Sequence, residues 1–234
     1  MALSNFQHHI LLVILCLALG CNQVATPIEA SSNPPEQVAP QVEEIAVTPP
    51  DYDTTQWLEV TDLDPTIRLD LRYATDNNFV GEKMYDCGRC FYRPKVARAL
   101  VRVHQALRQQ NLGLKMYDCY RPGPYQQRLW DKVPDPRYVA RPEKGSVHSR
   151  GAAADLTVVH FETGEELDMG TNFDFFGKEA YTTTTDLPEE VLSNRKLFQQ
   201  AMIAEGFLTI RTEWWHFNFA GPRFELSDWV WNCQ

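Results

Sequence analysis

Five segments of the chain have the sequence pattern of β-strands. The clearest is 67–73, in which apolar and polar residues alternate with a period of two, as they do in a half-buried strand. The others are 114–119, 153–159, 207–211 and 214–219. In the segment 153–159 the same alternation places Asp155 on one face of the strand and His160 on the opposite face.

Helical patterns lie between these strands. The longest helix is predicted to begin at Pro94 and to end before Asn111, because its apolar residues recur at the spacing of one helix face. A short helix is predicted over 125–130, and a later one ends at Gly206 with Ser193 as its N-cap.

The stretches 132–144 and 166–192 are predicted to be mostly loop. Strands come from both halves of the chain, and the helices form separate segments. This arrangement predicts an α+β fold, a single domain with a mainly antiparallel sheet flanked by helices.

The N-terminal region differs from the rest of the chain. Residues 1–20 contain an apolar run too short to span a bilayer and placed where a signal peptide has its apolar part. The run ends in Leu17 to Cys21, which resembles a bacterial lipobox, whose cysteine carries a lipid. Residues 21–56 are rich in proline and poor in aromatic residues, which is typical of a disordered tether. The folded domain is therefore expected over 57–234.

This organisation predicts an exported protein. A lipid on Cys21 would anchor the protein in a membrane, with the domain facing the periplasm or the cell exterior. An ordinary secretory signal is the alternative, and it would leave the protein free in the periplasm or outside the cell.

The formal net charge of -9 comes from the N-terminal region. All 22 Lys and Arg residues lie at or after Arg68, whereas nine acidic residues precede it. Residues 68–234 therefore contain equal numbers of acidic and basic residues and are formally neutral. Because nucleic-acid binding requires a basic surface, this composition argues against nucleic acid as a partner.

The predicted domain contains the cysteines Cys87, Cys90, Cys119 and Cys233. An even number of cysteines in an exported domain favours disulfides, and four cysteines allow three pairings, between which the sequence does not decide. A four-cysteine zinc site is the weaker alternative, because only one pair has the Cys-x-x-Cys spacing.

Two histidines and two carboxylates form the strongest candidate site. His148 and Asp155 flank Gly151, and Glu213 and His216 follow about sixty residues later. His148, Asp155 and His216 are a suitable ligand set for catalytic zinc, because three protein ligands leave the fourth tetrahedral position open for water. Glu213 would then take the proton of that water. In a regular strand Glu213 and His216 point to opposite faces, so the strand must end or bulge between them.

The other two histidines of the domain lack such surroundings. His104 lies beside the apolar face of the long helix with no acidic residue or second histidine at ligand spacing, so we expect a structural role. His160 points away from Asp155 and is not expected to bind a metal.

The chain resembles the zinc peptidases that cleave D-alanyl-D-alanine, and specifically the D-alanyl-D-alanine dipeptidases known from vancomycin resistance. The similarity covers about residues 70–219 and consists of five short motifs in the family's order. The motifs are Arg72-Tyr73-Ala-Thr with Asp76-Asn-Asn-Phe79, Asp118-Cys-Tyr-Arg121-Pro122, Ser146 to Asp155, Met169-Gly-Thr-Asn-Phe-Asp174 and Glu213 to His216.

This resemblance implies zinc-dependent hydrolysis of the dipeptide D-Ala-D-Ala to two D-alanines, with one zinc ion per chain. It implies that His148, Asp155 and His216 bind the zinc ion. Glu213 is implied to be the general base, and Arg121 is implied to stabilise the charge that develops on the carbonyl oxygen.

The resemblance also implies three substrate-binding residues. Asp174, Ser146 and Tyr73 match positions that line the substrate site, where a carboxylate would hold the free ammonium group of a dipeptide. Such a contact favours dipeptides over longer chains, because an acylated amine carries no positive charge.

Two other functions remain open at this point. The stretch between Arg121 and Ser146 is shorter than in the vancomycin-resistance enzymes, which leaves a carboxypeptidase or endopeptidase that cuts longer cell-wall peptides as an alternative. A non-catalytic zinc module that binds cell-wall fragments is the second alternative. Glu213 and Arg121 argue against that module, because a structural metal site needs neither a base nor an oxyanion partner.

Overall fold

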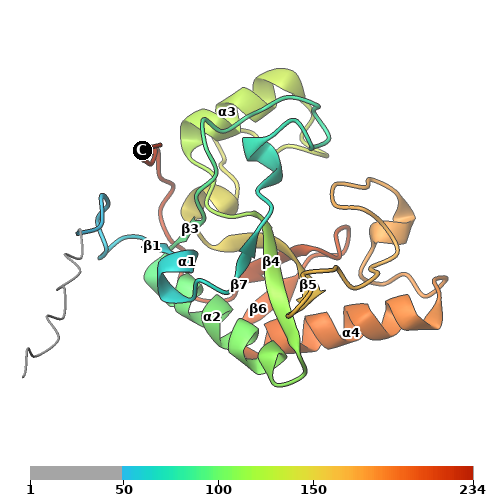
Figure 1. Cartoon of the computed structure of the whole chain (residues 1–234). Coiled ribbons are helices and arrows are strands. Elements are labelled where there is room, and N and C mark those ends of the chain that lie inside the picture. Colours follow the sequence, from blue (N-terminus) through green and yellow to red (C-terminus); the bar gives the residue numbers. More distant parts are fainter. Residues whose placement is uncertain (1–48, 234) are drawn as a thin grey trace, which may run out of the picture. The chain divides into compact units, whose positions relative to one another are not determined.

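Within residues 49–233, which the structure describes, a five-stranded sheet forms the centre of the protein (Figure 1). The structure is a computed structural model. The predicted signal peptide and most of the predicted tether, including Cys21, lie outside the described residues. The strand order is β2 (Arg68–Leu69), β4 (Leu112–Asp118), β5 (Ala153–His160), β7 (His216–Phe219) and β6 (Phe207–Thr209).

The directions of these strands confirm the predicted fold class. β2 runs parallel to β4, whereas the pairs β4–β5, β5–β7 and β6–β7 are antiparallel. The protein therefore has an α+β fold with a mainly antiparallel sheet.

Helices α2 (Pro94–Arg108) and α4 (Glu189–Ala204) cover one side of this sheet (Figure 1). α2 packs against β4, α4 packs against β6, and the two helices contact each other. Pro94 suits the first position of α2 because its fixed φ is already helical. The apolar face that the sequence predicts is buried, as Val96, Leu100 and Val103 are each 0% exposed.

The remaining elements are short. They are α1 (Val60–Leu63), α3 (Gly123–Lys132), the antiparallel pair β1 (Leu58–Glu59) and β3 (Phe91–Tyr92), and the 3₁₀ turns Arg72–Ala74, His148–Arg150 and Lys178–Ala180.

β5 is buried on both faces and paired at both edges. Its first seven residues are all buried, and β4 and β7 are its neighbours in the sheet. Leu156 and Val158 belong to the hydrophobic core, and Asp155 is also buried. An ionised carboxylate in such surroundings requires a cation or hydrogen-bond donors beside it.

Several predicted element boundaries are wrong. Only Arg68–Leu69 of the segment 67–73 forms a strand, because the chain then bends into the turn Arg72–Ala74 that buries Tyr73. Helix α4 begins at Glu189 rather than after Ser193, because Pro188 occupies the N-cap and acidic residues in the first turn suit a helix N-terminus. The predicted strand 214–219 starts only at His216.

The predicted tether extends too far toward the domain. Asp51 lies in the segment assigned to the tether, yet it forms an ion pair with Arg89 at 2.9 Å. Arg89 also pairs with Glu59 at 2.7 Å and donates a hydrogen bond to the carbonyl oxygen of Asn232 at 3.2 Å. The folded part of the chain therefore includes residues just before Trp57.

Disulfides join the four cysteines of the described domain as Cys87–Cys233 and Cys90–Cys119. This result selects one of the three possible pairings and excludes the four-cysteine zinc site. The first disulfide fastens the C-terminal segment, in which Trp231 is 3% exposed and packs against Tyr85.

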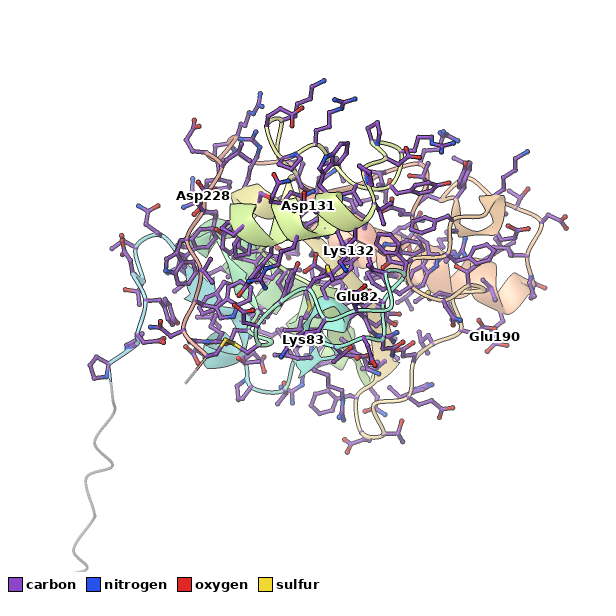
Figure 2. All side chains as sticks on the ribbon, turned by 90° about the horizontal axis from the view of Figure 1, so that it is seen from above. Glu82, Lys83, Asp131, Lys132, Glu190 and Asp228 are labelled. Carbon is purple, nitrogen blue, oxygen red and sulfur yellow. A yellow bond between two sulfur atoms is a disulfide. The ribbon has the colours of Figure 1, made fainter. Side chains whose placement is uncertain are left out.

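The surface carries ion pairs between separate segments. At the end of α3, Lys132 pairs with Glu82 at 2.6 Å (Figure 2). Both side chains are about half exposed, and such surface pairs contribute little to stability. Among the described residues, no helix has the length and apolar character that crossing a bilayer requires.

Candidate metal centre

Three side chains from separate elements converge at one end of β5. His148 comes from the turn His148–Arg150, Asp155 from β5 and His216 from the first position of β7. Asp155 and His216 are direct partners in the β5–β7 ladder, so their side chains lie on the same face of the sheet. Their potential ligand atoms and that of His148 all lie within 4.8 Å of one another.

The turn that carries His148 depends on Gly151. Gly151 closes the turn with a φ of +67°, and its amide donates a 2.9 Å hydrogen bond to the carbonyl oxygen of His148. A Cβ atom at this position would lie 2.4 Å from the Trp57 ring. Only glycine therefore meets both the conformational and the spatial requirement of the turn.

The two imidazoles are oriented by hydrogen bonds on their outer sides. His148 Nδ1 donates to the carbonyl oxygen of Cys119 at 2.7 Å, and His216 Nε2 donates to Asn218 Oδ1 at 3.0 Å. The opposite nitrogens, His148 Nε2 and His216 Nδ1, face each other at 3.3 Å. Such outer partners hold metal-binding histidines in the required tautomer and orientation.

The electrostatics of the cluster are dominated by Asp155. Burial raises the pKa of this carboxyl, but His148 and His216 outweigh burial and bring the pKa well below its usual range. Burial lowers the pKa of His216, but the hydrogen bond and the charge of Asp155, together with the charge of Glu213 and the hydrogen bond to Asn218, outweigh burial and raise the pKa to about 9. Two imidazoles and one ionised carboxylate, all close together, fit the ligand set of a catalytic zinc ion.

Glu213 lies beside this cluster because β7 starts only at His216. The bends before β7 remove the strand geometry that would have turned Glu213 to the other face, and its Oε2 atom lies 3.9 Å from His216 Nδ1. Burial raises the pKa of Glu213 above its ordinary value, and Asp155 adds to this effect. The sequence-based requirement that the strand end between these residues is met.

Arg121 is buried and is held by a polar network. Its Nη2 and Nε atoms donate to Asp118 Oδ2 at 2.6 and 3.2 Å, Nε also contacts the hydroxyl of Tyr85, and Nη1 donates to Gln126 at 3.1 Å. Asp118 is fully buried. Burial lowers the pKa of Arg121, but the charge of Asp118, its hydrogen bond and the contributions of Tyr85 and Tyr73 together outweigh burial and raise the pKa, so the guanidinium remains charged.

Asp118 and Tyr85 support the site but were not predicted as site residues. Asp118 does lie in one of the five motifs, three residues before Arg121, and this spacing was the available signal. Tyr85 carried no comparable signal, because it comes close to Arg121 only through the tertiary fold: its hydroxyl donates to Asp118 Oδ1 at 2.7 Å.

The predicted substrate-binding residues lie in two places. The Tyr73 hydroxyl donates to Asp174 Oδ2 at 2.9 Å, and Asp174 adopts a positive φ of 59°. Burial, and then the charge of Asp155, raise the pKa of Asp174 well above its usual range. Ser146 lies next to the ligand turn, where its Oγ accepts a hydrogen bond from the backbone amide of His148 at 3.2 Å.

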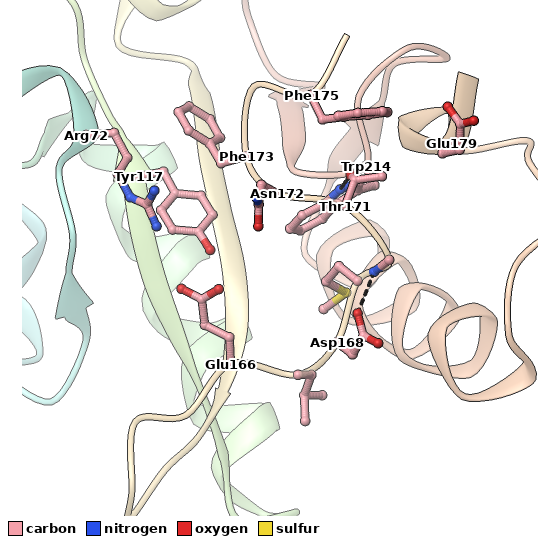
Figure 3. Close-up of a pocket in the computed structure, with 13 residues that line it drawn as sticks. Arg72, Tyr117, Glu166, Asp168, Thr171, Asn172, Phe173, Phe175, Glu179 and Trp214 are labelled. Atoms are coloured by element: carbon pink, nitrogen blue, oxygen red, sulfur yellow. Dashed lines mark hydrogen bonds between the residues drawn. The ribbon is translucent and has the colours of Figure 1, made fainter. Parts of the chain in front are cut away.

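A pocket of about 590 Å³ is lined largely by residues 166–173, the segment that leads to Asp174 (Figure 3). Its wall includes Phe173 and Trp214, the immediate sequence neighbours of Asp174 and Glu213. Trp214 donates a hydrogen bond to Thr171 at 2.8 Å, whereas Trp215 is 1% exposed in the core. Trp214 therefore borders the pocket, and both tryptophans belong to the hydrophobic core.

The other two histidines of the domain lie where the sequence predicted. His104 is buried in α2, accepts a hydrogen bond from the amide of Leu114 at 3.0 Å and contacts Thr66 Oγ1 at the same distance. His160 is exposed at the end of β5. His104 is therefore a packing residue, and His160 is separate from the metal cluster.

A buried His-Asp-His cluster with a carboxylate beside it, on an α+β scaffold, defines the site of a metallohydrolase. The chain belongs to the D-ala-D-ala dipeptidase family, whose characteristic sequence matches residues 53–228. The members of this family are zinc metallopeptidases, and the protein is a zinc metallopeptidase as well.

Similar proteins carry the same family name. A D-alanyl-D-alanine dipeptidase from Escherichia coli (strain K12) is 36% identical over 165 residues, which are 70% of this chain and 85% of the relative. The D-alanyl-D-alanine dipeptidase of Enterococcus faecalis (strain ATCC 700802 / V583) is 31% identical over 173 residues, with 64% and 85% covered. Among solved structures, the LdcB LD-carboxypeptidase aligns with a TM-score of 0.42 and 17% identity, over 74% of this chain and 72% of that chain.

We predict that replacement of either histidine of the cluster abolishes tight zinc binding. His216→Ala should lower the affinity for zinc by at least about 100-fold, because one of three protein ligands is lost. His160→Ala is the matched control and should bind zinc as the wild type does, because His160 is exposed at the far end of β5. Titration of the zinc-free proteins against a chromophoric chelator measures both affinities. Equal affinities of the two variants would contradict the assignment.

Proposed function

We propose that the protein hydrolyses the dipeptide D-alanyl-D-alanine to two D-alanines, at a zinc ion bound by His148, Asp155 and His216. The convergence of these three ligands, with the Glu213 carboxylate on the same side, carries the proposal. The family name of the relatives supports the choice of substrate.

Zinc, when bound, polarises the peptide carbonyl group and makes water more acidic. Glu213 is placed to accept a proton from this water and to pass it to the nitrogen of the leaving D-alanine. A raised pKa suits this role, because a carboxylate with a pKa closer to neutral is a stronger base for the water proton, and its protonated form can still donate that proton to the leaving nitrogen.

Arg121 is the proposed partner of the negative charge that develops on the carbonyl oxygen. Its guanidinium is fixed by Asp118, Tyr85 and Gln126, so little reorganisation is needed during the reaction. Arg121 also lies near enough to Glu213, the proposed base, for the guanidinium charge to lower the pKa of the Glu213 carboxyl. Preorganised charges of this kind contribute a few kcal/mol to transition-state binding, roughly 3–4 kcal/mol per donor.

Asp174 is the proposed partner of the substrate ammonium group. Burial raises the pKa of Asp174, and Asp155 and Glu213 lie close enough for their negative charges to raise it further. A divalent metal and an ammonium group supply the positive charge that such a group of carboxylates requires. The Tyr73 hydroxyl donates a hydrogen bond to Asp174 and holds its side chain in place. The Ser146 oxygen accepts a hydrogen bond from the His148 amide, so the Ser146 hydroxyl can donate its own proton to a substrate oxygen.

A peptidase of longer cell-wall peptides is the second candidate. Arg72 and Phe173 line both the pocket of Figure 3 and a smaller pocket of about 440 Å³ that includes Asp174. These adjoining pockets offer space beyond Asp174 for residues that precede a D-Ala-D-Ala end. The two candidates differ in whether the substrate amine is free or acylated.

The first prediction for this mechanism concerns the base. Glu213→Gln should retain zinc with near wild-type affinity but lower kcat by about 10²–10⁴-fold, because the amide cannot accept the proton. Measurement of kcat on D-Ala-D-Ala together with zinc content tests this expectation. Glu190→Gln, at an exposed position on α4, is the control and should leave kcat unchanged. Full activity of Glu213→Gln would refute the assigned role.

The second prediction concerns substrate length. The wild-type protein should hydrolyse free D-Ala-D-Ala with a much higher kcat/KM than N-acetyl-D-Ala-D-Ala. Asp174→Asn should raise the KM of the free dipeptide by roughly 10-fold or more, because a hydrogen bond to a charged group is lost. The KM of the acetylated peptide should change little. Preference of the wild type for the acetylated peptide would favour the second candidate.

We also propose that the protein is exported and anchored by a lipid on Cys21. The lipobox-like segment supports the anchor, and the disulfides of the domain support export, because such bonds persist in oxidising compartments. Cys21→Ala should move the protein from the membrane fraction to the aqueous fraction and abolish labelling with radioactive fatty acid. Unchanged labelling would exclude Cys21 as the lipid site.

A further inference from the structure

His148 is held from its outer side by the residues that follow β4. Its Nδ1 atom donates a 2.7 Å hydrogen bond to the carbonyl oxygen of Cys119, and its own carbonyl oxygen accepts a 3.2 Å hydrogen bond from the amide of Arg121. A carbonyl oxygen only accepts, so Nδ1 carries the proton and Nε2 is the nitrogen left for a metal. The position of Cys119 therefore decides where the ligand nitrogen of His148 lies.

The β-ladder does not hold Cys119 itself. The last pair of the β4–β5 ladder is Asp118 with Asp155, and the register shifts between Met116 and Asp118. The Cys119 side chain is instead bonded to Cys90, and these cysteines are 2% and 0% exposed. The disulfide thus restrains the chain at the point where regular strand pairing ends.

Cys90 is a firm anchor for this restraint. Its carbonyl oxygen accepts a 2.9 Å hydrogen bond from the amide of Val60 at the start of α1. The next residue, Phe91, is 0% exposed, belongs to β3 and accepts a 3.0 Å hydrogen bond from the amide of Tyr120. The segment around Cys90 is therefore attached to the small sheet and the core, independently of the metal ligands.

We propose that the Cys90–Cys119 disulfide positions His148, so that the affinity of the site for zinc depends on this disulfide and not on Cys87–Cys233. Cys119 acts as a positioning residue through its carbonyl oxygen. The residue before Cys119 is Asp118, the last residue of β4, whose Oδ1 atom accepts a 2.9 Å hydrogen bond from the Cys119 amide and whose Oδ2 atom accepts hydrogen bonds from Arg121. The disulfide therefore restrains a zinc ligand and the support of the proposed oxyanion partner together.

The other disulfide is a matched control within the same chain. Cys87–Cys233 closes a much longer loop, with a sequence separation of 146 compared with 29, and fastens the C-terminal segment. Cys87 is half-buried and Cys233 is exposed. Neither residue lies in the segment 118–121, which contacts His148 and contains Arg121.

The test compares the zinc affinities of two double variants, Cys90→Ala/Cys119→Ala and Cys87→Ala/Cys233→Ala, by chelator competition. The first should bind zinc at least about tenfold more weakly than the wild type, as expected for the loss of a partner that orients a ligand. The second should remain within about twofold. Near-ultraviolet circular dichroism of the zinc-free proteins shows whether each variant is folded.

Equal zinc affinity in both folded variants would overturn the proposal. If Cys90→Ala/Cys119→Ala does not fold, the folded, zinc-free Cys87→Ala/Cys233→Ala variant is treated with a phosphine to reduce its remaining disulfide. Weaker zinc binding by the folded, reduced protein supports the proposal, whereas unchanged binding or global unfolding overturns it. The inference rests on His148 as a zinc ligand. That assignment fails separately if His148→Ala binds zinc as the wild type does.

Discussion

The pairing of Asp155 with His216 is the contact on which the site depends. These residues are direct partners in the β5–β7 ladder, and their side chains lie 2.8 Å apart. Because backbone hydrogen bonds fix the two strands, both ligands are placed before any metal binds. His148 then needs only a short turn, closed by Gly151, to reach the same point. The sheet thus provides two of the proposed ligands and a turn provides the third.

The charge balance of the site explains its polar surroundings. Asp155 and Glu213 are buried or half-buried carboxylates, and Asp118 is fully buried. Each has a cationic or hydrogen-bonding partner, because an unpaired buried charge is strongly destabilising. The Asp118 carboxylate balances the positive charge of Arg121 and holds its guanidinium in one orientation. The carboxylates that face the metal cluster have fewer cationic partners. Their remaining negative charge suits a divalent ion and a cationic substrate group.

The residues that converge at the proposed metal site and the core strand β5 could be predicted from the sequence, but the supports of the site could not. His148, Asp155, Glu213 and His216 were identified because their residue types and order carry chemical information. Long, periodic elements such as α2 were predicted for the same reason. The disulfide pairing and the hydrogen bond from His148 to Cys119 depend on where distant segments meet, and no local pattern encodes that. The short strand β2 was overestimated because alternation persists in its sequence where strand pairing has already ended.

The central claim is that His148, Asp155 and His216 share one zinc ion beside Glu213. Anomalous diffraction at the zinc absorption edge, from crystals of the zinc-loaded protein, tests this claim most directly. The account predicts one strong peak per chain, within about 2.0–2.2 Å of His148 Nε2, His216 Nδ1 and an Asp155 carboxylate oxygen. A peak at another position, or ligation by Glu213 in place of one of the three, would contradict the account.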